Sequence, residues 1–126
     1  MTVKHILIID DEEDIQEVAQ LALELVGGWQ VSTANSATEG LLLAEAQQPD
    51  AILLDVMMPD IDGIATFEKL QANPATKQIP VILLTAKVQS HDQRRFAQLG
   101  VIGVIAKPFK SMHLANQVSE LLGWTC

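Results

Sequence analysis

The chain has 126 residues, of which 48% are hydrophobic and 19% are charged, and its net charge at pH 7 is −8. This length suits a single globular domain, and the composition excludes an intrinsically disordered chain. The acidic balance argues against direct contact with nucleic acid or an anionic membrane surface, because phosphate contacts need clustered lysine and arginine. A cation is the more natural ligand.

The cysteine content and the N-terminal segment indicate the compartment. The one cysteine, Cys126, excludes an intrachain disulfide and fits a reducing environment. No apolar run approaches the ~18 residues of a membrane span. The short apolar run at 6–9 is followed at once by the acids of 10–14, which is unlike a signal peptide. We therefore expect a soluble, cytoplasmic protein.

Apolar runs alternate along the chain with segments of helical periodicity. Ser36-x-x-Glu39 and Ser90-x-x-Gln93 are capping boxes that open two of the helices. The second strand is the most polar, which places it at a sheet edge. We predict strands at about 3–9, 29–34, 51–54, 79–84 and 101–106, and helices at about 13–26, 36–48, 63–72, 90–99 and 111–122.

Three of the predicted helices carry apolar side chains on one face, which we expect to pack on the sheet. These residues are Ile15, Val18, Ala19, Ala22, Leu25 and Val26 in the first helix, Ile64, Phe67 and Leu70 in the third, and Leu114, Val118, Leu121 and Leu122 in the last. Trp124 follows the last helix, where it would either cover the core or stay exposed as a contact residue.

Strict alternation of strands and helices predicts a parallel sheet with helices on both faces. Right-handed crossovers leave few topologies for five strands. We predict an α/β, flavodoxin-like (βα)5 doubly wound fold with strand order 2-1-3-4-5. This order sets the first strand beside the third, so Asp10, Asp11 and Asp55 would meet outside the carboxyl ends of the strands.

Polar residues stand where four of the predicted strands end. Asp10-Asp11 ends the first apolar run, Asp55 the third, Thr85 the fourth and Lys107 the fifth. The carboxyl ends of parallel strands lie at one edge of a sheet. Three acids, a hydroxyl and an ammonium would therefore form one polar site.

Carboxylates grouped in this way repel one another. Two unit charges ~4 Å apart cost about 4 kcal/mol at an effective dielectric near 20. Lys107 neutralises one charge, and oxygen-only ligands select a hard divalent ion such as Mg2+ for the rest. Acids also favour a helix N-terminus, which accounts for Glu12, Glu13 and Asp14 but not for the distant Asp55.

Asp55 is also the candidate nucleophile. The sequence has no Ser-His-Asp arrangement, no cysteine near a histidine and no phosphate-binding glycine loop. An aspartate carboxylate attacks phosphorus to form an acyl phosphate. A phosphoryl group on Asp55 would lie beside a metal ion, Lys107 and the Thr85 hydroxyl, which supply the charge neutralisation that phosphoryl transfer needs.

Four motifs in this order resemble the receiver domain of two-component response regulators, of the single-domain kind related to the chemotaxis regulator. They are Ile9-Asp10-Asp11-Glu12, Leu54-Asp55-Val56-Met57-Met58-Pro59-x-x-x-Gly63, Leu83-Leu84-Thr85-Ala86 and Ala106-Lys107-Pro108-Phe109. The resemblance covers the whole chain, so residues 1–126 are expected to be one receiver domain without an output domain. It implies a phosphorelay switch rather than an enzyme, catalysing only its own phosphorylation and dephosphorylation.

The resemblance also implies a role for each site residue. Asp55 would accept the phosphoryl group from the phosphohistidine of a sensor histidine kinase or a phosphotransfer protein. Mg2+ would be the cofactor, bound directly by Asp11, Asp55 and the backbone carbonyl of Met57, with Asp10 acting through water. Lys107 would pair with the phosphoryl group.

The output of the switch is implied in the same way. Thr85 would move toward the phosphoryl group, and the Lys107-Pro108 peptide would be cis. A downstream protein would bind the fourth helix, fifth strand and fifth helix, and the chain would be a monomer or a phosphorylation-dependent dimer. The family's common aromatic residue three positions before the lysine is here Val104, so output would rest on the loop after Thr85 and on the fourth helix.

Three other functions compete with this switch. A haloacid-dehalogenase-like, Mg2+-dependent phosphohydrolase would need a second aspartate where Met57 stands, and a cap insertion. A flavin-binding electron carrier would place a phosphate in the first strand–helix loop, which here holds five consecutive acids. The third alternative is a receiver fold that docks without phosphorylation. The intact site argues against it, although the departure at Val104 leaves room for it.

Overall fold

The computed structural model describes residues 3–58, 60–86, 96 and 98–124. The strands are β1 (His5–Ile9), β2 (Gln30–Ala34), β3 (Ala51–Asp55), β4 (Val81–Thr85) and β5 (Gly103–Ala106), and the helices are α1 (Glu13–Leu25), α2 (Ala37–Gln47), α3 (Gly63–Ala72) and α5 (Ser111–Leu122). The predicted helix at 90–99, with its capping box at Ser90, lies for the most part outside the described residues. Within those residues, no helix has the length and apolar character needed to cross a bilayer.

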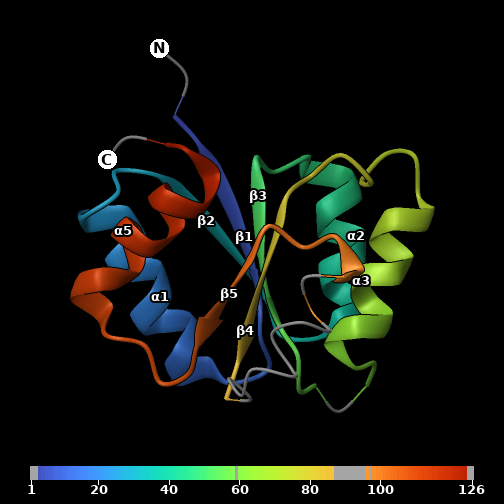
Figure 1. The fold of residues 1–126 in the computed structure, drawn as a ribbon, viewed down its shortest axis with the longest axis horizontal. Helices are drawn as coiled ribbons and strands as arrows, with labels where there is room; N and C mark the ends of the chain where they lie inside the picture. The colour runs from blue at the N-terminus through green and yellow to red at the C-terminus, as the bar shows by residue number, and fades with distance from the viewer. Residues whose placement is uncertain (1–2, 59, 87–95, 97, 125–126) are drawn as a thin grey trace.

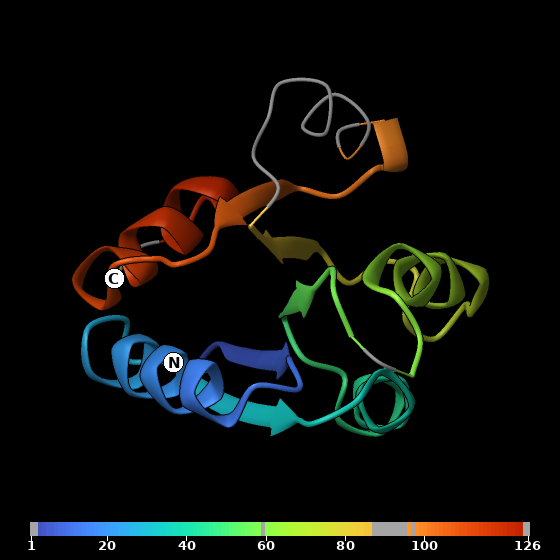
Figure 2. The ribbon, with the colours of Figure 1, turned by 90° about the horizontal axis from the view of Figure 1, so that it is seen from below.

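The five strands form one parallel sheet in the order β2-β1-β3-β4-β5, as the sequence predicts. α1 and α5 cover one face of this sheet, and α2 and α3 cover the other (Figures 1 and 2). The polar strand β2 lies at one edge, so the predicted edge position is confirmed. This is the flavodoxin-like, doubly wound α/β fold.

The core consists of two layers, one between each face of the sheet and its helices. Alternate residues of a strand point to opposite faces. Ile6 and Ile8 of β1 therefore pack under α1 and α5, whereas Leu7 and Ile9 pack under α2 and α3. All four side chains are fully buried. Burial on both faces explains why the central strands are continuous apolar runs rather than alternating ones.

The apolar face predicted for α1 is wrong in part. Val18, Leu25 and Val26 are 43%, 80% and 47% exposed. The buried residues of α1 are Gln16, Ala19, Ala22 and Leu23. Apolar residues occupy so much of this helix that periodicity does not decide which side faces the sheet. Val18, Leu21, Leu25 and Val26 instead line a groove of about 310 Å3 with Ser111 and Met112 of α5.

Trp124 covers the core at the end of α5. Its ring meets Trp29 edge to face, with centroids 5.2 Å apart and planes at 80°. The Nζ atom of Lys4 lies 5.3 Å from the Trp124 ring centroid, within the usual cation–π range. Of the two positions considered for Trp124, the structure shows the half-buried lid.

The loop from β3 to α3 folds back tightly at Gly63. The Gly63 N–H donates to the Val56 carbonyl at 2.8 Å, and the Asp62 carboxylate caps α3 by accepting from Ala65 N at 2.8 Å. A Cβ atom on Gly63 would lie 2.4 Å from the Asp55 carbonyl oxygen and 2.5 Å from Val56 Cα. Both are backbone atoms that cannot rotate away, so glycine is required where the chain passes the end of β3.

Replacing Gly63 with alanine should lower the free energy of unfolding by about 3 kcal/mol, the upper end of the usual cost of overpacking. Denaturant titration of Gly63→Ala against wild type measures the loss. Glu68→Ala, at an exposed position of the same helix, is the matched control and should change stability by less than about 0.5 kcal/mol. Equal effects of the two substitutions would contradict the close approach at Gly63.

Candidate functional site

The polar strand ends that the sequence predicts to meet do lie together. Asp10 directly follows β1, Asp55 is the last residue of β3, and Thr85 is the last residue of β4. Lys107 follows β5, and its backbone N–H donates to the Thr85 carbonyl at 2.9 Å. The strands are parallel, so their carboxyl ends lie at the same end of the sheet (Figure 1). The strand bounds and register place these four residues at that end.

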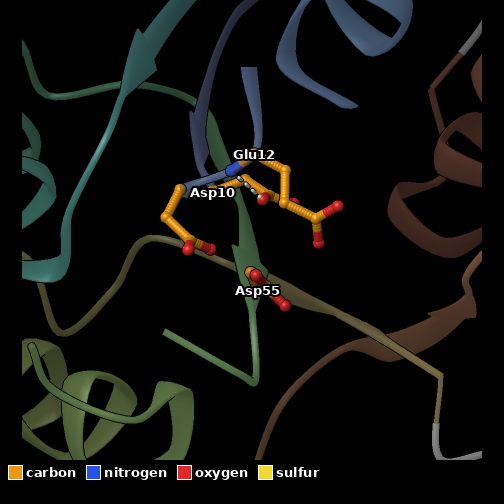
Figure 3. Close-up of side chains that lie close together, drawn as sticks. Asp10, Glu12 and Asp55 are labelled. Carbon is orange, nitrogen blue, oxygen red and sulfur yellow. Dashed lines mark hydrogen bonds between the residues drawn. The ribbon is translucent and has the colours of Figure 1, made fainter. Parts of the chain in front are cut away.

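Four carboxylates gather at this end of the sheet. Asp10, Asp11, Glu12 and Asp55 each offer an oxygen atom, and these atoms lie within 4.8 Å of one another. Asp10 and Asp55 are buried, whereas Asp11 and Glu12 are exposed. Figure 3 shows Asp10 and Glu12, from the loop after β1, beside Asp55 at the tip of β3. The sequence predicts only a helix N-terminal role for Glu12, and the structure adds its carboxylate to the cluster.

Lys107 brings an ammonium into this acidic cluster. Its Nζ atom lies 2.8 Å from Oδ2 of Asp10, 3.2 Å from Oδ1 of Asp55 and 3.5 Å from Oε1 of Glu12. The side chain is only 12% exposed, so solvent screens its contacts with the two buried acids less than it screens a surface ion pair. The cis Lys107-Pro108 peptide expected from the resemblance is present. Set against one ammonium, these carboxylates leave the site negative.

Burial and charge act in different proportions on Asp55 and Lys107. The pKa of the Asp55 carboxyl is raised to about 6, mainly by burial. The hydrogen bond from the Met57 N–H, at 3.1 Å, lowers this pKa. The charge of Asp10 raises it further, and Lys107 lowers it. Burial lowers the pKa of Lys107, but its hydrogen bond to Asp10 and the charges of Asp10 and Asp55 outweigh burial and raise it overall. Lys107 therefore stays an ammonium, whereas the surroundings of Asp55 disfavour its charged form.

A hard divalent cation fits the residues around Asp55. The buried Oδ2 atom of Asp55 has no hydrogen-bond partner among the described residues, an arrangement that is costly for a buried carboxylate. The surrounding donors are carboxylate oxygens, the ligand type that Mg2+ prefers. Three of the predicted ligands, Asp10, Asp11 and Asp55, lie in this cluster. Their role as ligands, and that of the Met57 carbonyl, stays a prediction.

Thr85 and Val104 lie on the two strands beyond Asp55. Thr85 is buried at the tip of β4, the neighbour of β3. Val104 of β5 is half-buried and packs against the core layer under α2 and α3. A branched aliphatic side chain therefore occupies the position at which the family commonly has an aromatic residue. The signalling roles of both residues stay predictions.

The raised pKa of Asp55 predicts how stability depends on pH. The folded value of about 6 exceeds the ordinary value of 3.8, so the folded state holds this proton more tightly and Asp55 lowers stability as pH rises from about 4 to about 6. Asp55→Asn removes this charge. Without divalent metal, the unfolding free energy of Asp55→Asn relative to wild type should be about 1–3 kcal/mol higher near pH 7.5 than near pH 4.5.

Denaturant titration at the two pH values measures this difference. Asp14→Asn, at an exposed acid of α1, is the control and should show no such change. A difference between Asp55→Asn and wild type that is the same at both pH values would contradict the raised pKa.

Comparison with known proteins identifies relatives over most of the chain. The family model of the response regulator receiver domain matches residues 6–119 of this chain. The chain is 37% identical over 119 residues to the alkaline phosphatase synthesis transcriptional regulatory protein PhoP of Bacillus subtilis, covering 94% of this chain and 48% of that protein. It is 36% identical over 118 residues to the DNA-binding dual master transcriptional regulator RpaA of Synechocystis, covering 94% of this chain and 48% of that protein. The chain thus spans about half the length of the curated relatives it matches.

Solved structures show the same fold. The chemotaxis response regulator CheY4 of Vibrio cholerae superposes with a TM-score of 0.87 at 25% identity, covering 95% of this chain and 99% of that chain. The receiver domain of a sensor histidine kinase from Pseudomonas aeruginosa, with a magnesium ion coordinated in its active-site cleft, gives a TM-score of 0.84 at 29% identity, covering 97% and 99%. With strand order, site geometry and relatives in agreement, this chain belongs to the family of response regulator receiver domains of two-component systems.

Proposed function

We propose that this receiver domain is a phosphorylation-controlled switch whose phosphoryl group is carried by Asp55. The observation that carries the proposal is the surroundings of Asp55. One oxygen of its buried carboxylate has no hydrogen-bond partner in the described part of the chain, and the carboxylate lies beside the ammonium of Lys107 and within the acidic cluster. Nucleophile, counter-charge and metal-ligating oxygens are thus within reach of one another, as phosphoryl transfer requires.

The transfer exchanges one bond to phosphorus for another. A carboxylate oxygen of Asp55 attacks the phosphorus atom, a P–O bond forms, and the P–N bond of a donor phosphohistidine breaks. The imidazole leaves with the electron pair and takes up a proton. The donor in this proposal is a sensor histidine kinase or a phosphotransfer protein. A pKa of about 6 leaves most Asp55 carboxyls ionised, and so nucleophilic, at neutral pH.

Lys107 and the neighbouring acids supply charge neutralisation and cation binding in this proposal. The Lys107 ammonium is 3.2 Å from Asp55, which places it to offset the charge of the incoming phosphoryl oxygens. Asp11, Asp55 and the Met57 carbonyl would hold Mg2+ directly, with Asp10 acting through water. When bound, this ion supplies charge neutralisation for the carboxylates and the phosphoryl oxygens.

Output in this proposal passes through the β4 and β5 ends of the sheet to a partner protein. Thr85 would turn its hydroxyl toward the phosphoryl group. The partner surface would be the predicted fourth helix, β5 and α5. Two of the relatives are named as transcriptional regulators, but a net charge of −8 argues against direct DNA contact by this domain.

Incubation with acetyl phosphate and Mg2+ should add one phosphoryl group to wild type and none to Asp55→Asn, because the acceptor oxygen is lost. Intact-mass spectrometry measures the addition. Asp14→Asn, which removes an exposed acid outside the cluster, should be labelled like wild type. Equal labelling of wild type and Asp55→Asn would reject Asp55 as the acceptor, and no labelling of wild type would favour a docking module that works without phosphorylation.

Mg2+ should raise the melting temperature of wild type by relieving carboxylate repulsion. At a concentration about 100 times the dissociation constant, the gain is about 2.7 kcal/mol, or several degrees for a domain of this size. Asp11→Ala should abolish the shift, which differential scanning calorimetry measures. Glu13→Ala, next to the cluster but outside it, should keep the shift. A wild-type protein that melts at one temperature with and without Mg2+ would argue against the metal site.

A further inference from the structure

A buried amide joins the acidic loop to the neighbouring strand. Gln16 lies on α1, and its side chain is only 7% exposed. Its Nε2 atom donates to the carbonyl oxygen of Asp10, to the carbonyl oxygen of Ala34 at 3.1 Å, and to Oδ1 of Asn35 at 2.7 Å. An amide has two N–H groups, so three acceptors share two protons. The switch described above assigns no role to this residue.

The acceptors of Gln16 belong to two different strand ends. Asp10 opens the loop after β1, whereas Ala34 is the last residue of β2 and Asn35 follows it. The N–H of Asp10 donates to the same Ala34 carbonyl at 3.1 Å. Without the Gln16 amide, the Asp10 carbonyl would lose a donor in a buried place, which costs more than an exposed hydrogen bond would.

The backbone and side chain of Asp10 are held from several directions. Ala34 accepts from its N–H and Gln16 donates to its carbonyl. Glu12 N donates to its Oδ1 at 2.9 Å, and Lys107 lies 2.8 Å from its Oδ2. The peptide between Asp10 and Asp11 contains the carbonyl that Gln16 holds. If this peptide changed its orientation, the side chain of Asp11 would turn away from the acidic cluster.

We propose that Gln16 is a positioning residue for the cation site. It fixes the peptide between Asp10 and Asp11, and thereby the directions in which these two carboxylates leave the loop. The inference rests on the proposed function, because it concerns residues placed there as Mg2+ ligands. Partners that orient metal ligands typically change metal affinity 10–100-fold when they are removed.

Gln16→Met tests the role, because methionine has nearly the length and volume of glutamine but no N–H donor. The dissociation constant for Mg2+, measured by isothermal titration calorimetry, should rise about 10-fold or more. The Mg2+ concentration that half-saturates phosphorylation by acetyl phosphate should rise by a similar factor, whereas the rate at saturating Mg2+ should stay close to that of wild type. Gln20→Met, at a half-buried position about one turn further along α1, is the matched control and should leave both constants unchanged.

A metal-free measurement separates positioning from a general loss of stability. Amide hydrogen exchange at Asp11 and Glu12 should become faster in Gln16→Met without Mg2+, while amides in β3 and β4 exchange as in wild type. Gln16→Asn keeps the amide but is one methylene too short to reach both strand ends. Gln16→Asn should therefore also weaken Mg2+ binding, and it provides the test if the methionine variant does not fold.

The outcomes distinguish this inference from the proposed function. If wild type binds Mg2+ and the Gln16 variants bind it equally well, with unchanged exchange at Asp11, the role of Gln16 is overturned and the switch stands. If wild type binds no Mg2+, the proposed metal site and the positioning role fall together. Weaker binding in both Gln16 variants, but not in Gln20→Met, supports the proposal.

Discussion

The ammonium of Lys107, placed between two buried carboxylates, is the interaction on which the site depends. Asp10 and Asp55 are 0% and 2% exposed, and an unpaired charge at such depth costs several kcal/mol. Lys107 meets them at 2.8 and 3.2 Å. It cannot neutralise both, and Asp11 and Glu12 add further charge nearby. The site therefore has more negative than positive charge, and a bound cation would offset the excess.

The order of the strands creates this arrangement. β1 lies beside β3, which brings Asp10 and Asp55 together, but β5 is separated from β3 by β4. Adjacent strands are about 4.8 Å apart, so the charge on β5 has to cross a strand to reach Asp55. The long stem of Lys107 spans that distance, and the tip of the intervening strand carries the small Thr85. A doubly wound sheet thus concentrates opposite charges that no local segment could bring together.

The sheet could be predicted from the sequence because the patterns that indicate its strands are local and repeated. Four apolar runs that end in a polar residue define both the strands and the end at which their side chains gather, and alternation with helices restricts the strand order. The side of α1 that faces the sheet was predicted in part wrongly, since Leu23 is buried there while Val18 and Leu25 are exposed, and the many apolar residues of this helix fit more than one face. Glu12 and Gln16 were missed for a different reason. Five consecutive acids look alike in sequence, and the burial of Gln16 depends on the end of β2, 18 residues away.

Under the proposed function, chemistry at Asp55 changes the partners of Lys107. A carboxylate carries one negative charge, whereas a phosphoryl group carries about −1.5 to −2. Lys107 would be drawn toward the phosphoryl oxygens and away from Asp10, with which it now makes its shortest contact. The backbone N–H of Lys107 is bonded to the Thr85 carbonyl, so a movement of Lys107 acts on the ends of β4 and β5 together. Because this route runs through backbone at the strand ends, it needs no rotating ring, and Val104 is compatible with it.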